Sequence, residues 1–118
     1  MTAAKLSERK CVPCTAETPP LTPARVSELH AEIPGWALGA GGKWLSRSWR
    51  VADFLTGLDF FRRVGEIAEA EDHHPNLHLT DYRDVRIELW THAVGGLTEN
   101  DFVVAAKIDA LEQPKLKA

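Results

Sequence analysis

The sequence lacks a long apolar run and contains few cysteines. None of its segments approaches the roughly 20 consecutive apolar residues that a transmembrane helix needs. Cys11 and Cys14 are the only two cysteines, too few for a disulfide framework, and a reducing compartment would keep them as thiols. The formal charge of -3 provides no broad positive field. We therefore expect neither a membrane nor a nucleic acid as a partner.

The N-terminus also lacks the apolar stretch of a secretory signal, because charged residues are spread over its first ten positions. We therefore expect a cytoplasmic location. A chain of 118 residues with 44% apolar content is typical of one compact domain.

Proline and the absence of periodicity divide this chain into three parts. Residues 1–20 show no sustained periodicity and include three prolines, so we expect a flexible N-terminal arm. The folded domain is predicted over 21–113, and 114–118 form a C-terminal tail. The arm carries Cys11-Val12-Pro13-Cys14, a spacing found in redox pairs and in half zinc sites. We favour free thiols, because a tetrahedral site needs two more ligands, which only pairing of two subunits would supply.

Three helix starts can be recognised. Thr22 followed by Pro23 combines an N-cap oxygen with proline at the first helical position. Asp53 is the predicted cap of a longer helix, in which Gly57 and Gly65 would allow close approach of the sheet. Thr98 caps the last helix, with Asp101 reaching back as in a capping box.

Between these helices, alternating patterns predict four strands. They cover residues 36–38 and 43–51 around a glycine-rich turn, then 78–82 and 85–91 around a turn at 83–84. The order α-β-β-α-β-β-α predicts an α+β fold, a four-stranded antiparallel sheet with three helices packed on one face. The other face would be exposed or used for assembly. Three tryptophans in the first hairpin are expected in core or interface packing rather than in stacking on a flat ring: Trp36, Trp44 and Trp49.

The remaining chemistry lies in a histidine cluster. The sequence reads Glu69-x-x-x-His73-His74-Pro75 and, after the predicted hairpin, Thr91-His92. Imidazole titrates near neutrality, so such a cluster indicates proton transfer, metal binding or a pH switch. Metal binding is the weaker alternative, because neighbouring histidines seldom bind one ion and no carboxylate or thiol stands at a zinc spacing. We predict no metal and no other cofactor.

Several motifs in order resemble the pterin-4a-carbinolamine dehydratase family over roughly residues 21–112. They are Glu69-Ala70-Glu71-Asp72-His73-His74-Pro75, Tyr82-x-x-Val85-x-Ile87-x-Leu89-x-Thr91-His92, and Gly96-Leu97-Thr98-x-x-Asp101 followed by Ala105-Ala106-x-Ile108-Asp109. The segment between Pro75 and Tyr82 is one residue longer than in the animal enzymes of this family, so His78 within it is not carried over.

The resemblance implies a dehydratase that removes water from a 4a-hydroxytetrahydropterin to give a quinonoid dihydropterin, in tetrahydropterin recycling. It implies His73, His74 and His92 as the catalytic histidines, with His73 and His92 for proton transfer and His74 for gripping the pterin. The expected substrate-binding residues are Glu69, Asp72, Pro75, Trp90 and Thr91. Asp101 matches the family too, but its capping position supplies a sufficient structural reason.

The family also leaves alternatives open. The resemblance to this family implies a homodimer or homotetramer and a functional link to an aromatic amino acid hydroxylase. Animal members also act as dimerisation cofactors of a homeodomain transcription factor, so a non-enzymatic interaction protein is one alternative. A relative that acts on another pterin, such as a molybdenum-cofactor intermediate, is the other.

Overall fold

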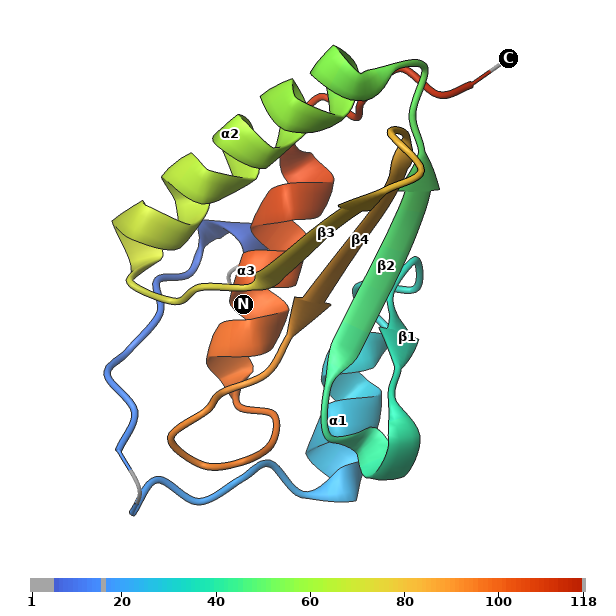
Figure 1. Cartoon of the computed structure of the whole chain (residues 1–118). Helices are drawn as coiled ribbons and strands as arrows, with labels where there is room; N and C mark the ends of the chain where they lie inside the picture. The colour runs from blue at the N-terminus through green and yellow to red at the C-terminus, as the bar shows by residue number, and fades with distance from the viewer. Residues whose placement is uncertain (1–5, 16, 118) are drawn as a thin grey trace.

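The computed structural model describes residues 6–15 and 17–117 as an α+β sandwich. Figure 1 shows the three α-helices on the same face of one sheet. The elements, in chain order, are η1 (Leu6–Glu8), α1 (Pro23–His30), β1 (Ala37–Leu38), η2 (Ala40–Gly42), β2 (Leu45–Arg50), α2 (Phe54–Glu71), β3 (Asn76–Thr80), β4 (Asp84–Leu89) and α3 (Glu99–Ala110). No helix in these ranges has both the length and the apolar character needed to span a bilayer.

The sheet has the strand order β1-β2-β4-β3, with every neighbouring pair antiparallel. The predicted fold class is thus confirmed. Alternate residues of the two central strands, such as Trp49 on β2 and Ile87 on β4, point toward the helices and are buried. They meet Phe60 of α2, whose ring lies 5.1 Å from that of Trp49. The opposite face of the sheet carries no helix, and polar side chains such as Ser48 and Arg86 lie exposed on it.

The helix starts follow the predicted local chemistry. The Thr22 hydroxyl accepts a hydrogen bond from the Arg25 amide at 3.2 Å, and the Asp53 carboxylate accepts one from the Thr56 amide at 2.8 Å. A Cβ on Gly57 would lie 3.1 Å from Leu79 of β3, so the expected close approach of the sheet is confirmed there. The same prediction is wrong for Gly65, because a Cβ there would meet nothing within 4 Å.

The second hairpin turns two residues earlier than predicted. Asp81 and Tyr82 have positive φ angles of 48° and 54°, and Asp84 pairs with Thr80 across the strands. Two successive left-handed residues match the twist of a tight hairpin, which is why the chain reverses there. Tyr82 is therefore part of the turn, and the prediction that a strand covers 78–82 was wrong by two residues at each end.

The first segment also differs from the prediction. Leu6 is only 2% exposed and belongs to the hydrophobic core. The Lys107 ammonium of α3 donates to the Ser7 carbonyl at 2.9 Å, and the Asn100 side chain makes two hydrogen bonds with the Val12 backbone. Residues 6 to 14 therefore pack against α3 instead of lying outside the core. Residues 1–5 and 16 lie outside the described residues, and the domain boundary at residue 21 stays a prediction.

This packing has a physical reason in α3, which is apolar on more than one face. Five apolar residues of this helix are buried: Phe102, Val103, Val104, Ala105 and Ile108. This helix contacts η1 as well as α2 and α1. The C-terminal tail is similarly attached, because Leu116 forms a β-bridge with Val51 at the end of β2.

Candidate functional site

The end of α2 separates the two neighbouring histidines. Asp72 adopts a left-handed conformation, φ 50° and ψ 43°, and ends the helix as its C-cap. The chain then runs extended through His73 and His74 into β3. The His73 side chain is 12% exposed and the His74 side chain is 55% exposed. The two imidazoles thus face different surroundings, which suits the separate tasks that the family resemblance implies for them.

His73 is held by a buried carboxylate of α3. Its Nε2 lies 2.7 Å from Oδ1 of Asp101, and the Asp101 side chain is fully buried. Since a carboxylate only accepts hydrogen bonds, Nε2 of His73 carries the hydrogen and donates it. In neutral imidazole, Nδ1 is then the nitrogen with a free lone pair. Asp101 therefore fixes both the ring orientation and the tautomer of His73.

The same carboxylate connects His73 to the segment that carries His92. Oδ2 of Asp101 accepts hydrogen bonds from the Thr91 hydroxyl at 2.8 Å and from the Thr98 amide at 2.9 Å. The hydroxyls of Thr91 and Thr98 lie 2.8 Å apart. Thr91 is the residue before His92, so one buried network joins the end of α2, the chain after β4 and the start of α3.

His92 lies in a loop rather than at the end of a strand. β4 ends at Leu89, and Thr91 forms an isolated bridge with Gly96 that closes the loop between them. The His92 side chain is exposed, and its ring lies 4.6 Å from that of Trp90 at a tilt of 48°. The position of His92 is thus set by the Thr91 bridge and by the neighbouring indole.

The third histidine pairs with an acid of the same helix end. Nε2 of His74 lies 2.7 Å from Oε2 of Glu69, and the Glu69 side chain is 80% exposed. An exposed pair of this kind contributes little to stability, typically under about 1 kcal/mol. Both groups therefore remain accessible to a ligand at the end of α2.

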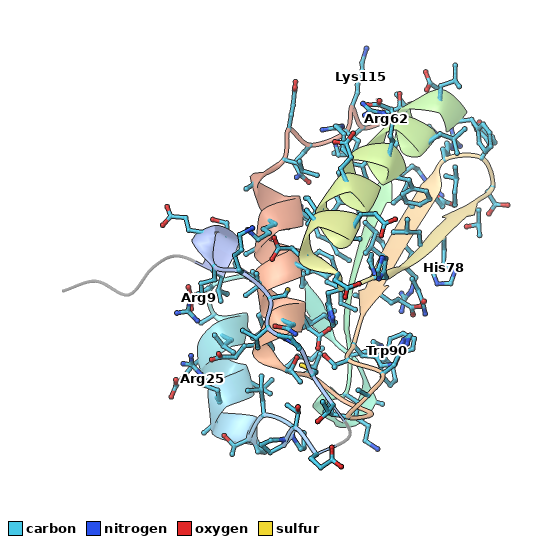
Figure 2. The ribbon with its side chains drawn as sticks, turned by 90° about the vertical axis from the view of Figure 1, so that its left-hand side faces the viewer. Arg9, Arg25, Arg62, His78, Trp90 and Lys115 are labelled. Atoms are coloured by element: carbon cyan, nitrogen blue, oxygen red, sulfur yellow. The ribbon has the colours of Figure 1, made fainter. Side chains whose placement is uncertain are left out.

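The predicted site residues contact one another in separate groups of two or three and do not form one continuous cluster. Thr91 joins the His73 network, Trp90 contacts His92, and Glu69 contacts His74. Asp72 is exposed and serves as a cap, and Pro75 is half-buried between His74 and β3. The sequence analysis did not carry His78 over as a site residue. Nε2 of His78 donates a hydrogen bond to Glu88 at 2.8 Å on the open sheet face, where Figure 2 shows His78 and Trp90.

Local sequence reasoning assigned Asp101 only a capping role. The cap is present, because Asp101 accepts from the Thr98 amide, but the other carboxylate oxygen binds His73. A separation of 28 residues gives no local signal of that contact. The one available signal was the family motif Gly96-Leu97-Thr98-x-x-Asp101, which ends at this residue.

The cysteine pair lies near this network, and Cys11 is a poor nucleophile there. The backbone amide of Cys11 donates to the Glu71 carboxylate at 2.8 Å. Sγ of Cys14 lies 3.2 Å from Nδ2 of the Asn100 side chain. Burial, followed by the nearby Glu71 charge, raises the pKa of the Cys11 thiol to about 12. Within 6–15 and 17–117, no three histidine, cysteine or acidic side chains are grouped so that they could hold a metal ion.

Comparison with known proteins identifies the family. A sequence model described as pterin 4 alpha carbinolamine dehydratase matches residues 19–111. The chain belongs to this family. The match covers α1 through α3 and therefore all of the site described above.

Relatives within the pterin carbinolamine dehydratase family agree over most of the chain. "Pterin-4-alpha-carbinolamine dehydratase 2, mitochondrial" of Arabidopsis thaliana is 52% identical over 92% of this chain, which spans 60% of the length of that plant protein. A "putative pterin-4-alpha-carbinolamine dehydratase 1" of Gloeobacter violaceus is 45% identical over 90% of this chain and 92% of its own. A crystal structure from Brucella melitensis, titled as a transcriptional coactivator/pterin dehydratase, has a TM-score of 0.71 and 33% identity over 78% of this chain and 97% of its own.

Proposed function

We propose that this protein removes water from a 4a-hydroxytetrahydropterin, giving a quinonoid dihydropterin, by histidine acid–base catalysis. Membership of the dehydratase family supports the reaction. The observation that carries the catalytic role is the contact of His73 with the buried Asp101. A histidine whose tautomer is fixed by a buried carboxylate is prepared to move a proton at its other nitrogen.

The reaction needs two proton transfers and no change of oxidation state. The C4a–O bond breaks and the hydroxyl leaves as water after taking a proton. A ring N–H loses its proton, and its electron pair forms the new C=N bond. Nδ1 of His73 exchanges a proton with the pterin at one of these positions, and the exposed imidazole of His92 serves the other. A positioned acid or base typically contributes about 10²–10⁴-fold to such a step.

The end of α2 supplies the groups for binding the pterin. The amino-pyrimidine edge of a pterin presents N–H donors, and the exposed Glu69 carboxylate offers two oxygens to accept them. His74, which is hydrogen-bonded to Glu69, contacts the pterin ring beside that carboxylate. Asp72 and Pro75 border the same helix end, while Thr91 and Trp90 hold the opposite side near His92.

Stopped-flow measurement of 4a-hydroxytetrahydropterin dehydration tests this proposal with His73→Gln and His92→Gln. Each should lower kcat by about 10²-fold or more. His78→Gln is the matched control, because His78 is an exposed histidine bonded to Glu88 on the open sheet face. It should retain the wild-type rate. Equal losses in all three variants would contradict the site, and a wild-type rate no faster than buffer would contradict the reaction.

We further propose that the protein works in pterin recycling beside an aromatic amino acid hydroxylase, in the cytoplasm, and as a homodimer or homotetramer. The exposed Phe54 and Leu55 at the start of α2 support assembly. Light scattering of the purified protein tests the oligomer, since a mass near 13.1 kDa would exclude it.

A further inference from the structure

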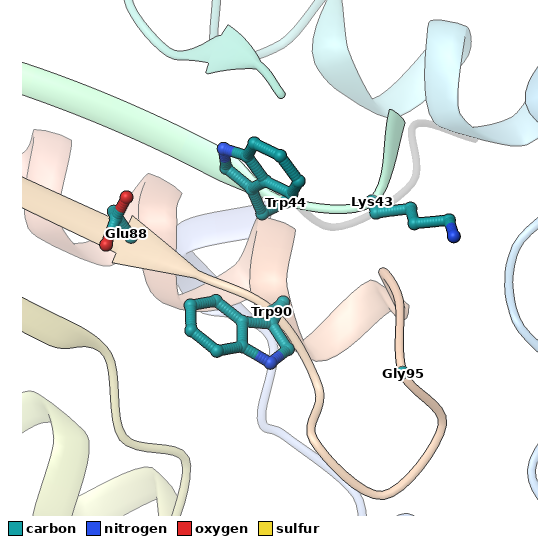
Figure 3. Close-up of a pocket in the computed structure, with 5 residues that line it drawn as sticks. All are labelled: Lys43, Trp44, Glu88, Trp90 and Gly95. Carbon is teal, nitrogen blue, oxygen red and sulfur yellow. The ribbon is translucent and has the colours of Figure 1, made fainter. Parts of the chain in front are cut away.

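A cleft beside His92 is formed on the open face of the sheet. It has a volume of about 400 Å³ and is lined by Lys43, Trp44, Glu88, Trp90 and Gly95. Figure 3 shows the two indoles on opposite sides of the cleft, with Lys43 at the end near Gly95 and Glu88 at the other end. The volume lies in the range of small-molecule sites.

The two indoles face each other because of the strand register. Leu45 of β2 pairs with Leu89 of β4, so Trp44 and Trp90 occupy the next opposite positions on the other face of the sheet. Side chains at such positions are direct cross-strand neighbours. The cleft is thus a space between two aromatic walls that the sheet itself holds apart.

The Trp44 side chain packs against the backbone of Gly39. The Gly39 amide donates to the Trp44 carbonyl at 2.8 Å, and a Cβ on Gly39 would lie 1.9 Å from the Trp44 ring. The indole therefore rests directly on the Gly39 backbone, where no other residue would leave room for it. The sequence predicted core or interface packing for this tryptophan, but Trp44 is only half-buried and lines the cleft.

Two residues that line the cleft are in contact with His92. The Trp90 ring lies 4.6 Å from the His92 ring, and the Gly95 amide donates to the His92 carbonyl at 3.3 Å. A ligand that reaches His92 thus has the cleft immediately beside it.

The charges of the cleft favour an anion. Glu88 is bonded to His78 at 2.8 Å and to Arg86 at 3.2 Å, so its negative charge is compensated, and the His78 bond is the main cause of its lowered pKa. Lys43 is exposed, and across the described part of the chain no carboxylate forms an ion pair with it. The end near Gly95 therefore offers an ammonium group that is free to bind an anion.

We propose that this cleft binds the substituent at C6 of the pterin, and that it selects an aryl group that carries a carboxylate. The inference rests on the proposed dehydration. C6 lies two bonds from the reacting C4a, so a substituent there projects past the catalytic histidines toward a neighbouring wall. The aryl ring enters between Trp44 and Trp90, where aromatic stacking adds to burial. The carboxylate meets the Lys43 ammonium.

Isothermal titration calorimetry with two 7,8-dihydropterins tests the proposal. Dihydropteroate carries an aminobenzoate group at C6, and 6-methyl-7,8-dihydropterin lacks it. Wild-type protein should bind dihydropteroate about tenfold more tightly, the gain expected from aromatic contact and one exposed charge pair. The readout is the ratio of the two dissociation constants, so a general loss of binding in a variant cancels.

Two variants of the cleft should lower this ratio, and one control should not. Trp44→Ala should reduce it about fivefold by removing one aromatic wall. Lys43→Gln, an exposed change that leaves the fold intact, should reduce it about threefold, and added salt should reduce the wild-type ratio as well. Lys115→Gln is the matched control, because Lys115 lines a different surface hollow near Asp53.

The possible outcomes separate this proposal from the proposed function. A wild-type ratio near one, or a ratio unchanged in both cleft variants, would overturn the aryl subsite while leaving the dehydration intact. Wild-type protein that binds neither pterin would overturn both. A raised wild-type ratio that falls in Trp44→Ala and Lys43→Gln, but not in Lys115→Gln, would establish the subsite.

Discussion

Nε2 of His73 lies 2.7 Å from Oδ1 of Asp101, a carboxylate that is fully buried at the start of α3. The other oxygen of Asp101 is used by the Thr91 hydroxyl and the Thr98 amide. Asp101 thus acts as a helix cap and as the group that positions a candidate catalytic histidine. The two roles can be separated by substitution.

Asp101→Asn should keep the cap and invert the tautomer of His73. The amide oxygen can still accept from Thr91 and Thr98, but the amide nitrogen then faces His73 and only donates. Nε2 of His73 must accept that bond, so Nδ1 carries the hydrogen. We expect kcat of the dehydration to fall by about 10²-fold or more, in the range of a lost acid or base.

Two further measurements distinguish positioning from general damage in this variant. The ¹⁵N shifts of the His73 ring should report the exchange of tautomers, and the thermal midpoint should remain near that of the wild type. Asp101→Ala should instead lose about 1–3 kcal/mol of stability, since buried donors lose their acceptor. Wild-type kcat in Asp101→Asn would contradict the positioning role.

The two glycines of α2 should respond differently to alanine. At Gly65 a Cβ meets nothing within 4 Å, so Gly65→Ala should raise the free energy of unfolding by about 0.5–1 kcal/mol. At Gly57 a Cβ would lie 3.1 Å from Cδ1 of Leu79, so Leu79 must shift and offset the gain. Urea unfolding of both variants checks this, and a larger gain at Gly57 would show that the contact with β3 is not tight.

The Cys11 thiol should react slowly with an alkylating agent in the folded protein. Its pKa is raised from 9.0 to about 12 by burial and by Glu71, so the thiolate fraction near pH 8 falls on the order of 10³-fold. In a Cys14→Ser variant, iodoacetamide should alkylate Cys11 far more slowly in buffer than in denaturant. Equal rates in the two conditions would show that the segment around Cys11 is not docked on α3.

The cap of α2 should make stability depend on pH. The hydrogen bonds from Thr56 hold the pKa of Asp53 below its ordinary value of 3.8. A folded-state pKa below the unfolded one stabilises the protein above pH 3.8, and this contribution is lost as the pH falls through the folded-state value. Asp53→Ala should lower the thermal midpoint by a few degrees, roughly 3–6 °C, at pH 7 and by less at pH 3.

Asp53→Ser is the matched control for this cap, because serine caps the helix without a charge. The difference between the serine variant and Asp53→Ala should therefore change little between pH 7 and pH 3. A wild-type advantage over the alanine variant that grows on acidification would contradict a lowered pKa of Asp53 in the folded protein.

Much of the fold could be predicted from the sequence, because short-range interactions determine it. The caps at Thr22 and Asp53 follow from short-range hydrogen bonding, and the alternation along β2 follows from the geometry of a strand. The different surroundings of His73 and His74 agree with the same geometry, because successive residues of an extended segment point to opposite sides. These features depend on neighbours within a few residues, which the sequence displays directly.

The features that local patterns missed depend on distant contacts or unusual backbone. The turn at Asp81 and Tyr82 requires positive φ in a tyrosine, which sequence patterns do not favour. The burial of Leu6 requires a second apolar face on α3, and the consecutive apolar run from Phe102 to Ala106 was the available signal. The facing of Trp44 and Trp90 requires the register of β2 on β4.

The most direct test of the central claim is the single-turnover rate of water loss from a 4a-hydroxytetrahydropterin, measured in buffer, with wild-type protein and with a His73→Gln/His92→Gln double variant. We predict that wild-type protein exceeds the buffer rate by at least about 10²-fold and that the double variant returns close to the buffer rate. A double variant as fast as the wild type, or a wild type no faster than buffer, would contradict the histidine site as the source of catalysis.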